Sequence, residues 1–313
     1  MRHALHCPHA TKCHPERSEF IRKANEFTES KDLLPIALRR CLREFSPDAS
    51  QSRIDSSNQA MPLQTFTARL TCSLPLSDLT KHLEFEMQVL TRFGFVAGQW
   101  LSFKTNKRDG EEIIRAYSIT SPPDDNNKFA LCLNRVQDGF MSNFLCDMKA
   151  GEEISCQGPF GDFILRPPMR DTVFIATGTG IAPFRSMLHW LLAPMEDGRP
   201  RPSSLDANKA RHQGKQLYLF FGNRTEKDIY YHDEFQRLAE QHPNFNYLPT
   251  LSRGGPEWKG LRGYVQEHVP GIIAGRSDMH AYICGLDKMV KANRDLLKSL
   301  GWDRKSILYE KYD

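Results

Sequence analysis

The sequence has 313 residues, of which 40% are hydrophobic and 26% charged, and its formal net charge is only +4 at pH 7. This composition is typical of a globular chain long enough for two domains. No apolar run approaches the roughly 20 residues of a membrane-spanning helix, and without a long basic block nucleic-acid binding has no support. The eight cysteines follow neither a disulfide framework nor an iron–sulfur spacing, which favours a reducing cytoplasm and places any iron–sulfur partner on a separate protein.

Residues 1–60 differ in composition from the rest of the chain. Histidines and cysteines crowd the first 14 residues, but their spacing fits no zinc module, so no metal site is expected. Residues 46–60 are rich in Ser, Asp and Asn, as linkers are. Met61 stands directly before the first strand-like segment. We therefore expect translation to begin near Met61, and residues 1–60 to be either a disordered tail or no part of the translated protein.

Residues 61–168 are expected to form a small antiparallel β-barrel. Residues 81–89 alternate in a pattern typical of a strand with one buried face. The apolar face is Leu83, Phe85, Met87 and Val89, and the polar face is His82, Glu84, Glu86 and Gln88. Short strand-like segments separated by turn residues continue the series: 65–74, 99–104, 113–120, 129–136 and 153–157. The one helix of this part is expected over 142–148, with Ser142 near its N-cap.

Residues 169–313 are expected to form an α/β domain with a parallel five-stranded sheet, because strand-like and helix-like segments alternate. The predicted strands are 172–176, 216–221, 245–251, 281–284 and 306–309. Helices are expected to begin near Pro183, Tyr231, Gly263 and Asp287. A long polar loop is expected over 194–214.

The stretch 173–186 joins a short buried strand to a helix through a glycine turn. Gly178 and Gly180 lack a Cβ, so a ligand can approach the backbone closely, and Pro183 suits the first turn of a helix. Such a turn at a helix N-terminus is a site for an anionic phosphate. The spacing Gly-x-Gly-x-x-Pro departs from the Gly-x-Gly-x-x-Gly fingerprint of dinucleotide-binding folds. A tight turn without a ligand is the alternative.

Six motifs in this order resemble those of the ferredoxin–NADP reductase superfamily, most closely its plant-type branch, over about residues 65–313. They are the flavin motif Arg-x-Tyr-Ser at 115–118, the pyrophosphate helix at 142–147, the turn closing the barrel at 158–161, the nicotinamide-side motifs at 177–186 and 282–286, and the Glu-x-Tyr tail at 310–312. The resemblance implies an FAD-binding barrel over 61–168 and an NAD(P)-binding domain over 169–313.

For the flavin, the resemblance implies that Arg115 binds the pyrophosphate and that Tyr117 lies against the ring or the ribityl chain. Ser118 would then lie near the flavin N5 atom and assist proton movement. The other residues implied in FAD binding are Thr120, Cys132, Asn134, Phe140, Met141, Ser142 and Tyr312. The segment between Arg135 and Gly139 is shorter than in plant-type members, where it carries an aromatic that stacks on the adenine, so FMN remains an alternative cofactor.

Four residues are implied as catalytic: Ser118, Cys284, Glu310 and Tyr312. Cys284 would orient the nicotinamide, Glu310 would relay a proton with Ser118, and Tyr312 would cover the flavin until the nicotinamide displaces it. An inert buried thiol and a surface ion pair are the alternatives for Cys284 and Glu310. Because Asp313 follows Tyr312, whereas plant-type enzymes end on the tyrosine, Tyr309 is the alternative stacking residue.

Two segments resemble the plant-type site for the coenzyme 2′-phosphate, Ser252–Arg253 and 262–266, with Arg262 where a lysine is usual. The sequence therefore favours NADP over NAD, although 225–228 also resembles NADH-using cytochrome b5 reductases. The residues implied at the coenzyme are Thr179, Gly180, Pro183, Gly222, Asn223, Ser252, Arg253, Arg262, Tyr264, Gln266, Cys284, Gly285 and Leu286.

The resemblance implies an enzyme that exchanges hydride with NADP(H) and single electrons with a separate carrier, such as ferredoxin or flavodoxin. One alternative is an NADH-dependent reductase component that serves an oxygenase or a b-type cytochrome. An alternative of another class is a flavin-binding electron-transfer subunit or sensor without turnover of its own. The presence of Ser118, Cys284 and Glu310 argues against this last alternative, and the small net charge does not identify the partner.

Overall fold

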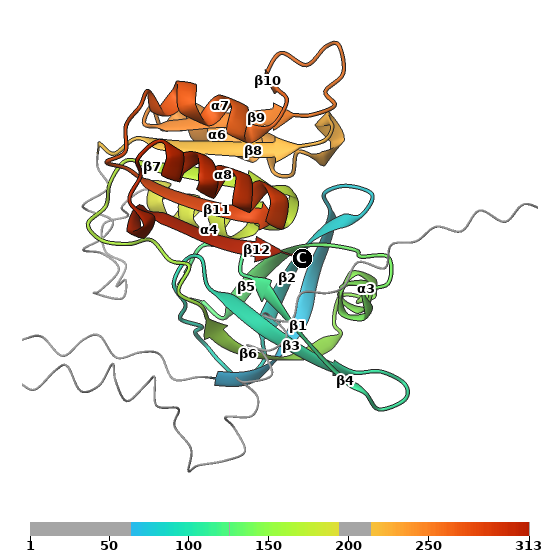
Figure 1. The fold of residues 1–313 in the computed structure, drawn as a ribbon. Helices are drawn as coiled ribbons and strands as arrows, with labels where there is room; N and C mark the ends of the chain where they lie inside the picture. Colours follow the sequence, from blue (N-terminus) through green and yellow to red (C-terminus); the bar gives the residue numbers. More distant parts are fainter. Residues whose placement is uncertain (1–63, 125, 194–213, 313) are drawn as a thin grey trace, which may run out of the picture. The chain divides into compact units, whose positions relative to one another are not determined.

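The structure is a computed structural model that describes residues 64–124, 126–193 and 214–312. The expected extension 1–60, the proposed start at Met61, nearly all of the predicted loop 194–214 and the terminal Asp313 lie outside the described residues. The described chain contains two sheets, one antiparallel and one parallel, as expected (Figure 1).

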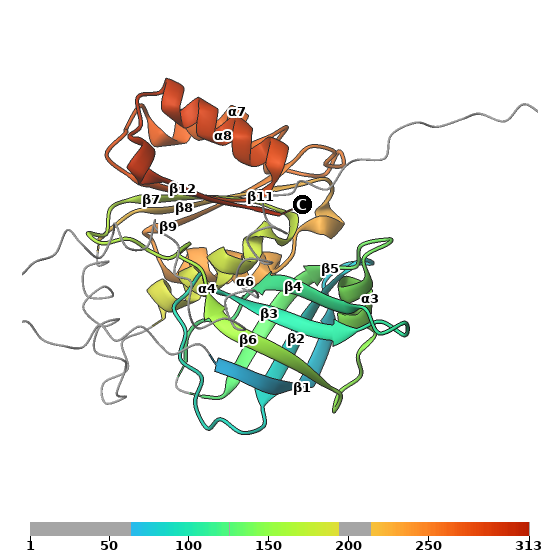
Figure 2. The same cartoon turned by 60° about the horizontal axis from the view of Figure 1, so that its bottom comes forward.

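The first sheet curls into a barrel (Figure 2). Among the described residues it has six antiparallel strands in the order β4-β3-β6-β1-β2-β5. A backbone bridge between Ile119 and Leu131 joins its two outer strands. The strands are β1 (Gln64–Pro75), β2 (Thr80–Met87), β3 (Trp100–Asn106), β4 (Glu112–Ser118), β5 (Lys128–Asn134) and β6 (Glu153–Phe160).

Phenylalanines fill the barrel and account for its strand alternation. Phe85 on β2 stacks on Phe129 of β5 with ring centroids 5.3 Å apart, and both are fully buried with Phe103. Two expectations for this region were wrong. Val89 lies beyond the end of β2 and is 86% exposed. His82, expected on the polar face, is buried, because Tyr231, the N-cap of a later helix, packs edge-on against its ring.

The barrel helix α3 (Phe140–Asp147) begins earlier than expected. Its N-cap is Gly139, not a residue near Ser142. The Ser142 hydroxyl instead donates to the Gly139 carbonyl at 3.0 Å and accepts from the Val136 N–H at 3.1 Å. In the sequence, a serine at the third helical position looks like an N-cap residue, although here its hydroxyl bonds back to the true cap. The predicted cap therefore fell three residues too late in the sequence.

The second sheet has six parallel strands in the described residues, one more than predicted, in the order β10-β9-β8-β7-β11-β12. The extra strand β10 pairs Leu261 with Thr250 and Arg262 with Leu251. Two residues are too few to show a strand periodicity, so the sequence gives no sign of it. The strands are β7 (Thr172–Thr177), β8 (Leu217–Asn223), β9 (Phe245–Leu251), β10 (Leu261–Arg262), β11 (His280–Leu286) and β12 (Ile307–Tyr312).

Helices cover both faces of this sheet (Figure 2). On one face α4 (Ile181–Leu192) and α6 (His232–Gln241) bury Phe184 and Phe235 against the strands, and on the other α7 (Val265–Ile273) and α8 (Asp287–Ser299) bury Val269 and Val290. Single-turn 3₁₀ segments are η1 (Gly178–Gly180), η2 (Glu226–Asp228) and η3 (Arg304–Ser306). In the described parts of the chain, no helix has the length and apolarity needed to cross a membrane.

A polar network joins the barrel to α4 and α6. Arg185 of α4 donates to both carboxylate oxygens of Glu234 at 2.7 and 3.0 Å, and to the backbone carbonyl of Thr120 at 3.1 Å. His82 of β2 lies 2.9 Å from the Tyr231 hydroxyl. His189 lies 2.5 Å from Glu234. These contacts hold the end of β4, and with it Ser118, against the second sheet.

Candidate functional site

The four expected catalytic residues lie together where β4 meets the carboxyl edge of the parallel sheet. The Ser118 hydroxyl donates to the Glu310 carboxylate at 3.5 Å, and it shares a 2.5 Å hydrogen bond with the hydroxyl of Tyr312. In the register of β11 and β12, Cys284 stands opposite Glu310 and is fully buried. A hydroxyl within reach of a carboxylate is an arrangement able to pass a proton.

Alternation along β12 separates the two tyrosines of the tail. Glu310 and Tyr312 share the face that reaches Ser118. Tyr309 is on the other face, 42% exposed, with the Arg294 guanidinium 3.7 Å above its ring. Burial raises the pKa of Tyr312 well above its usual value, and the neighbouring Cys284 and Glu310 raise it further. The Tyr312 hydroxyl is therefore neutral at pH 7.

The glycine turn between β7 and α4 is shaped by close backbone contact. A Cβ at Gly180 would collide with the Cys284 carbonyl oxygen. Gly178 has φ +54°, a conformation that suits glycine. Gly180 and Pro183 are buried, so they shape the turn, whereas Thr179 is partly exposed. The first turn of α4 has neither a side-chain cap nor an acidic residue, and its N-terminus therefore suits an anionic group.

On the barrel side, Arg115 is exposed on β4 and Tyr117 packs edge-on against Phe103 at 5.8 Å. Burial raises the pKa of Tyr117, while Arg115 lowers it. The first turn of α3 has no side-chain cap and no acidic residue. Phe140 at its start is 36% exposed. A cation, an aromatic ring and open helix N–H groups fit a flavin pyrophosphate and its neighbouring ribityl chain.

The other residues expected at the flavin make internal contacts. Thr120 and Met141 are buried, and Asn134 accepts a hydrogen bond from Thr80. Burial raises the pKa of the Cys132 thiol to about 12, against the pull of the nearby Tyr231 and Arg185. Ser142 likewise bonds within its own turn. These residues therefore pack and hydrogen-bond within the protein behind the expected flavin site.

Three arginines lie on the coenzyme side. The guanidinium of Arg262 is hydrogen-bonded within the protein, whereas in the described residues those of Arg253 and Arg224 are not. Arg262 donates to the carbonyls of Gly254, Gly255 and Trp258 at 2.9, 2.7 and 2.9 Å, and so holds the loop before it. Arg253 and Arg224 are exposed, and in the described residues neither guanidinium has a hydrogen bond or ion pair. Their backbones are joined by a 2.8 Å hydrogen bond.

Arg224 was not among the residues expected at the coenzyme, although its position directly after β8, at the carboxyl edge of the sheet, is a signal for a ligand contact. Ser252 lies beside the same strand end, where its N–H donates to the Asn223 carbonyl at 3.1 Å. Tyr264 is 61% exposed and Gln266 partly so. At Gly222 a Cβ would come within 2.8 Å of Val265. Gly285 has φ +142°, and the Leu286 N–H after it donates to Thr177 at 3.3 Å.

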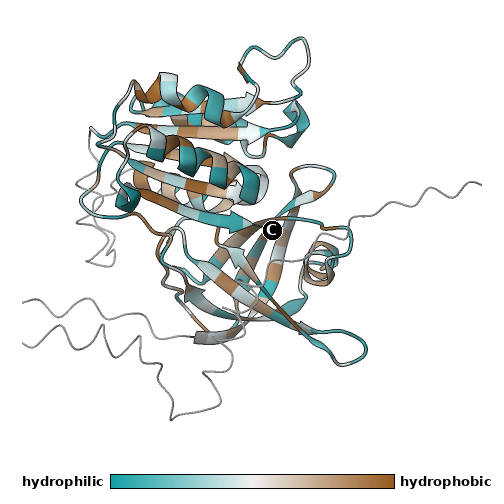
Figure 3. Cartoon of the chain, in the orientation of Figure 1, coloured by the Kyte–Doolittle hydropathy of each residue, from teal (hydrophilic) through white to brown (hydrophobic). Residues whose placement is uncertain are grey.

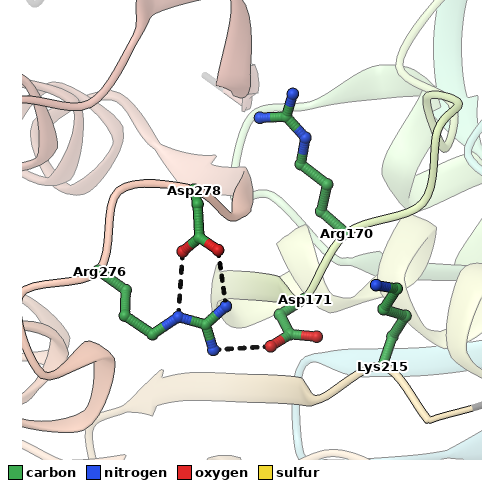
Figure 4. A pocket seen from close by; sticks show the side chains of 5 residues that line it. All are labelled: Arg170, Asp171, Lys215, Arg276 and Asp278. Atoms are coloured by element: carbon green, nitrogen blue, oxygen red, sulfur yellow. Dashed lines mark hydrogen bonds and ion pairs between the residues drawn. The ribbon is translucent and has the colours of Figure 1, made fainter.

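A separate charged hollow lies at the opposite, amino edge of the parallel sheet (Figure 4). Arg276 is paired there with both oxygens of Asp278, at 3.0 and 3.1 Å, and with Asp171 at 2.7 Å. These residues precede β7 and β11, so the hollow lies away from Cys284 and the glycine turn. Arg276 serves to tie the two strand starts together.

The sequence matches two family models, one for each sheet. "Oxidoreductase FAD-binding domain" matches residues 67–164, and "Oxidoreductase NAD-binding domain" matches residues 174–295. Fold and site therefore define a two-domain oxidoreductase that binds FAD and a pyridine nucleotide.

Relatives narrow this class to a family. The chain is 41% identical over 258 residues to ferredoxin–NADP reductase B of Sorangium cellulosum. The matched region covers 80% of this chain and 98% of the relative. The chain therefore belongs to the ferredoxin–NADP reductase family of FAD-dependent oxidoreductases that use NAD(P)H.

Two more distant relatives are named as the reductase component of a monooxygenase and as a cytochrome P450 reductase. The reductase component DmpP of phenol 2-monooxygenase from Pseudomonas sp. is 29% identical over 74% of this chain, which spans only 61% of that relative. The crystal structure of Amycolatopsis cytochrome P450 reductase GcoB superposes with a TM-score of 0.66, at 25% identity, over 80% of this chain and 70% of that one.

Proposed function

We propose that this enzyme passes hydride between NADPH and FAD, and single electrons between FAD and a separate ferredoxin or flavodoxin. The meeting of Ser118 with Glu310 and Tyr312 carries the proposal. Ser118 and Glu310 would pass the proton, and the Tyr312 ring would move aside for the nicotinamide, next to the buried Cys284. The cofactor supplies the electron chemistry; these side chains position it and handle the proton. The likeness to ferredoxin–NADP reductase B supports the choice of carrier.

The preference for NADP rests on Arg253 and Arg224. Two uncommitted guanidinium groups at adjoining strand ends would bind a 2′-phosphate with charge-assisted hydrogen bonds. In this proposal Arg262 does not bind the phosphate itself. It holds the loop 254–258 in place, and its effect on the phosphate is indirect. In this proposal residues 61–168 bind FAD, residues 169–313 bind the coenzyme, and residues 1–60 are not needed for either.

An NADH-dependent reductase that serves an oxygenase is the second candidate. The likeness to DmpP and the segment 225–228 favour it. In the structure Glu226 accepts from the Gly255 N–H at 2.8 Å, so a carboxylate lies near the loop that would meet the coenzyme ribose. A carboxylate in such a place suits the free hydroxyls of NADH and repels a 2′-phosphate.

Steady-state kinetics with NADPH and NADH separate the two candidates. We expect Arg253→Ala and Arg224→Ala each to lower kcat/KM for NADPH by about 10- to 100-fold, the size of one hydrogen bond to a charged group. The values for NADH should change little. Arg237→Ala, an exposed arginine on α6, is the control. A wild-type preference for NADH, untouched by either substitution, would support the second candidate. Reduction of ferredoxins, flavodoxins and b-type cytochromes under the same conditions identifies the carrier.

A further inference from the structure

The tail strand β12 lies at one edge of the parallel sheet (Figure 1). In the described residues β11 is the only strand that pairs with it, and the last two pairs are Gly285 with Lys311 and Leu286 with Tyr312. The end of an edge strand frays easily, because few backbone hydrogen bonds hold it. Tyr312 belongs to the last pair, so any contact that fastens this end of β12 also restrains its ring.

Helix α8 contacts β12 from one face. Side chains alternate along a strand, and Tyr309 and Lys311 both point to the face that α8 covers. The Arg294 guanidinium lies 3.7 Å above the Tyr309 ring, and the Lys311 Nζ lies 2.8 Å from a carboxylate oxygen of Asp287. Both partners come from α8, two turns apart on the same side of the helix. The opposite face of the strand carries the side chains that reach the candidate site.

The two contacts act at different points of the strand. Tyr309 stands opposite Ile283 within the ladder, where backbone pairs before and after it hold the strand. Lys311 is one residue from the end of β12, and its partner Asp287 is the first residue after β11. Asp287 also lies in the first turn of α8, where the helix dipole favours a carboxylate. The ion pair of Lys311 with Asp287, here called the tail ion pair, therefore joins the two strands where their ladder ends.

We propose that the tail ion pair sets how readily the Tyr312 ring is displaced, and thereby sets the affinity for the coenzyme. The inference rests on the proposed function, in which the nicotinamide takes the place of that ring. Asp287 directly follows the coenzyme-side motif 282–286, and Lys311 directly precedes Tyr312. Both are positioning residues. Without their ion pair the end of β12 frays more readily, which lowers the free-energy cost of moving the ring aside.

The expected effect is small but has an informative sign. The Lys311 and Asp287 side chains are 44% and 51% exposed, and exposed ion pairs are weak. Loss of a lysine near the proposed coenzyme site should, by charge alone, weaken the binding of an anionic coenzyme. Loss of the tail ion pair should strengthen it. The two explanations therefore predict opposite changes for the same substitution.

The test is a titration of the flavin-loaded full chain with NADP while the flavin spectrum is followed. Lys311→Met should raise the affinity for NADP by about two- to fivefold. It should also shift the flavin absorbance of the coenzyme-free enzyme in the same direction as Tyr312→Ser. Lys311→Arg, which retains the charge, should behave as wild type. Lys298→Met is the matched control, because Lys298 forms a partly exposed ion pair with Asp295 on the same helix.

Tyr312→Ser separates this inference from the proposed function. In that background Lys311→Met should have no further effect, because the ring that the tail ion pair restrains is gone. If Tyr312→Ser raises the affinity but Lys311→Met leaves it unchanged or lowers it, the tail ion pair does not restrain the ring, although the proposed role of Tyr312 stands. An equal rise from Lys311→Met with and without Tyr312 would also overturn the inference. If Tyr312→Ser itself changes neither affinity nor spectrum, the tyrosine does not cover the flavin and the inference falls with it.

Discussion

Tyr312 is partly buried, and in the proposed site its ring would have to move before a nicotinamide could reach the flavin. Its hydroxyl is bound to Ser118 and its pKa is raised by burial, so it stays neutral and uncharged beside Glu310. In the proposed site, the Tyr312 ring would compete with the coenzyme for one face of the flavin. Binding of coenzyme would then include the free-energy cost of displacing the ring.

We expect Tyr312→Ser to raise the affinity for both oxidised and reduced coenzyme, to perturb the flavin absorbance, and to blunt discrimination against NADH. Tyr309→Ser is the matched control, because Tyr309 faces Arg294 on the other side of β12. Each variant is titrated with NADP while the flavin spectrum is followed. A response from Tyr309→Ser alone would mean that the stacking tyrosine, and the role of Glu310 with it, are wrongly assigned.

At the scale of elements, the turn from β7 through η1 into α4 depends on the close approach of Gly180 to β11. Its φ is an ordinary −60°, so alanine meets no backbone strain there. The obstacle is the Cys284 carbonyl, which is backbone and cannot rotate away. An added methyl group must therefore push the end of β11, and Cys284 with it, out of place.

Gly180→Ala should lower the free energy of unfolding by about 1–3 kcal/mol, the usual cost of overpacking, and weaken coenzyme binding. Gly271→Ala on α7, where a Cβ meets no atom within 4 Å, should be neutral or stabilising, since alanine favours helix. Chemical unfolding and coenzyme titration measure both effects. Equal stabilities for the two variants would show that β11 yields easily and that the turn is not rigid.

The elements were largely predictable, whereas most contacts between them were not. The meeting of Ser118 with Glu310 was expected only from the family resemblance, not from any local pattern. Period-two alternation and buried β-branched runs revealed every strand of four residues or more, because those patterns arise within one segment. β10 escaped, being two residues long. His82 was assigned to solvent because its cover, Tyr231, comes 149 residues later. The commitment of Arg262 to three loop carbonyls depends likewise on how a loop folds back, which no local pattern records.

At the scale of the whole molecule, Glu234 is the centre of the network that joins barrel and sheet. Burial alone would raise its pKa, but His189 and Arg185 outweigh burial and lower it from 4.5 to about 2. A folded-state pKa below the unfolded one means that the carboxylate adds stability above about pH 4.5. That stability is lost as the pH falls toward 2. A shift of this size corresponds to roughly 3 kcal/mol.

Glu234→Gln should therefore be destabilised most at pH 7, and the difference from wild type should shrink as the pH falls to 3. Urea unfolding at several pH values measures it, with Glu240→Gln, a glutamate exposed on the same helix, as control. A gap that stays constant with pH would indicate that Glu234 acts through packing or hydrogen bonds that the amide retains, rather than through its charge.

The hydrogen bond between Ser118 and Tyr312 joins residues 194 positions apart. Contacts of such high sequence separation close a very long loop, and they slow folding because much chain entropy is lost before they form. The flavin motif on β4 belongs to a sheet whose strands all lie within residues 64–160. Its partners Glu310 and Tyr312 lie on β12, the last strand of the fold. During folding, the chain should therefore become able to bind flavin well before it becomes catalytically active. Recovery of activity after refolding should lag behind recovery of bound flavin, with the lag measuring how long β12 takes to reach the edge of its sheet.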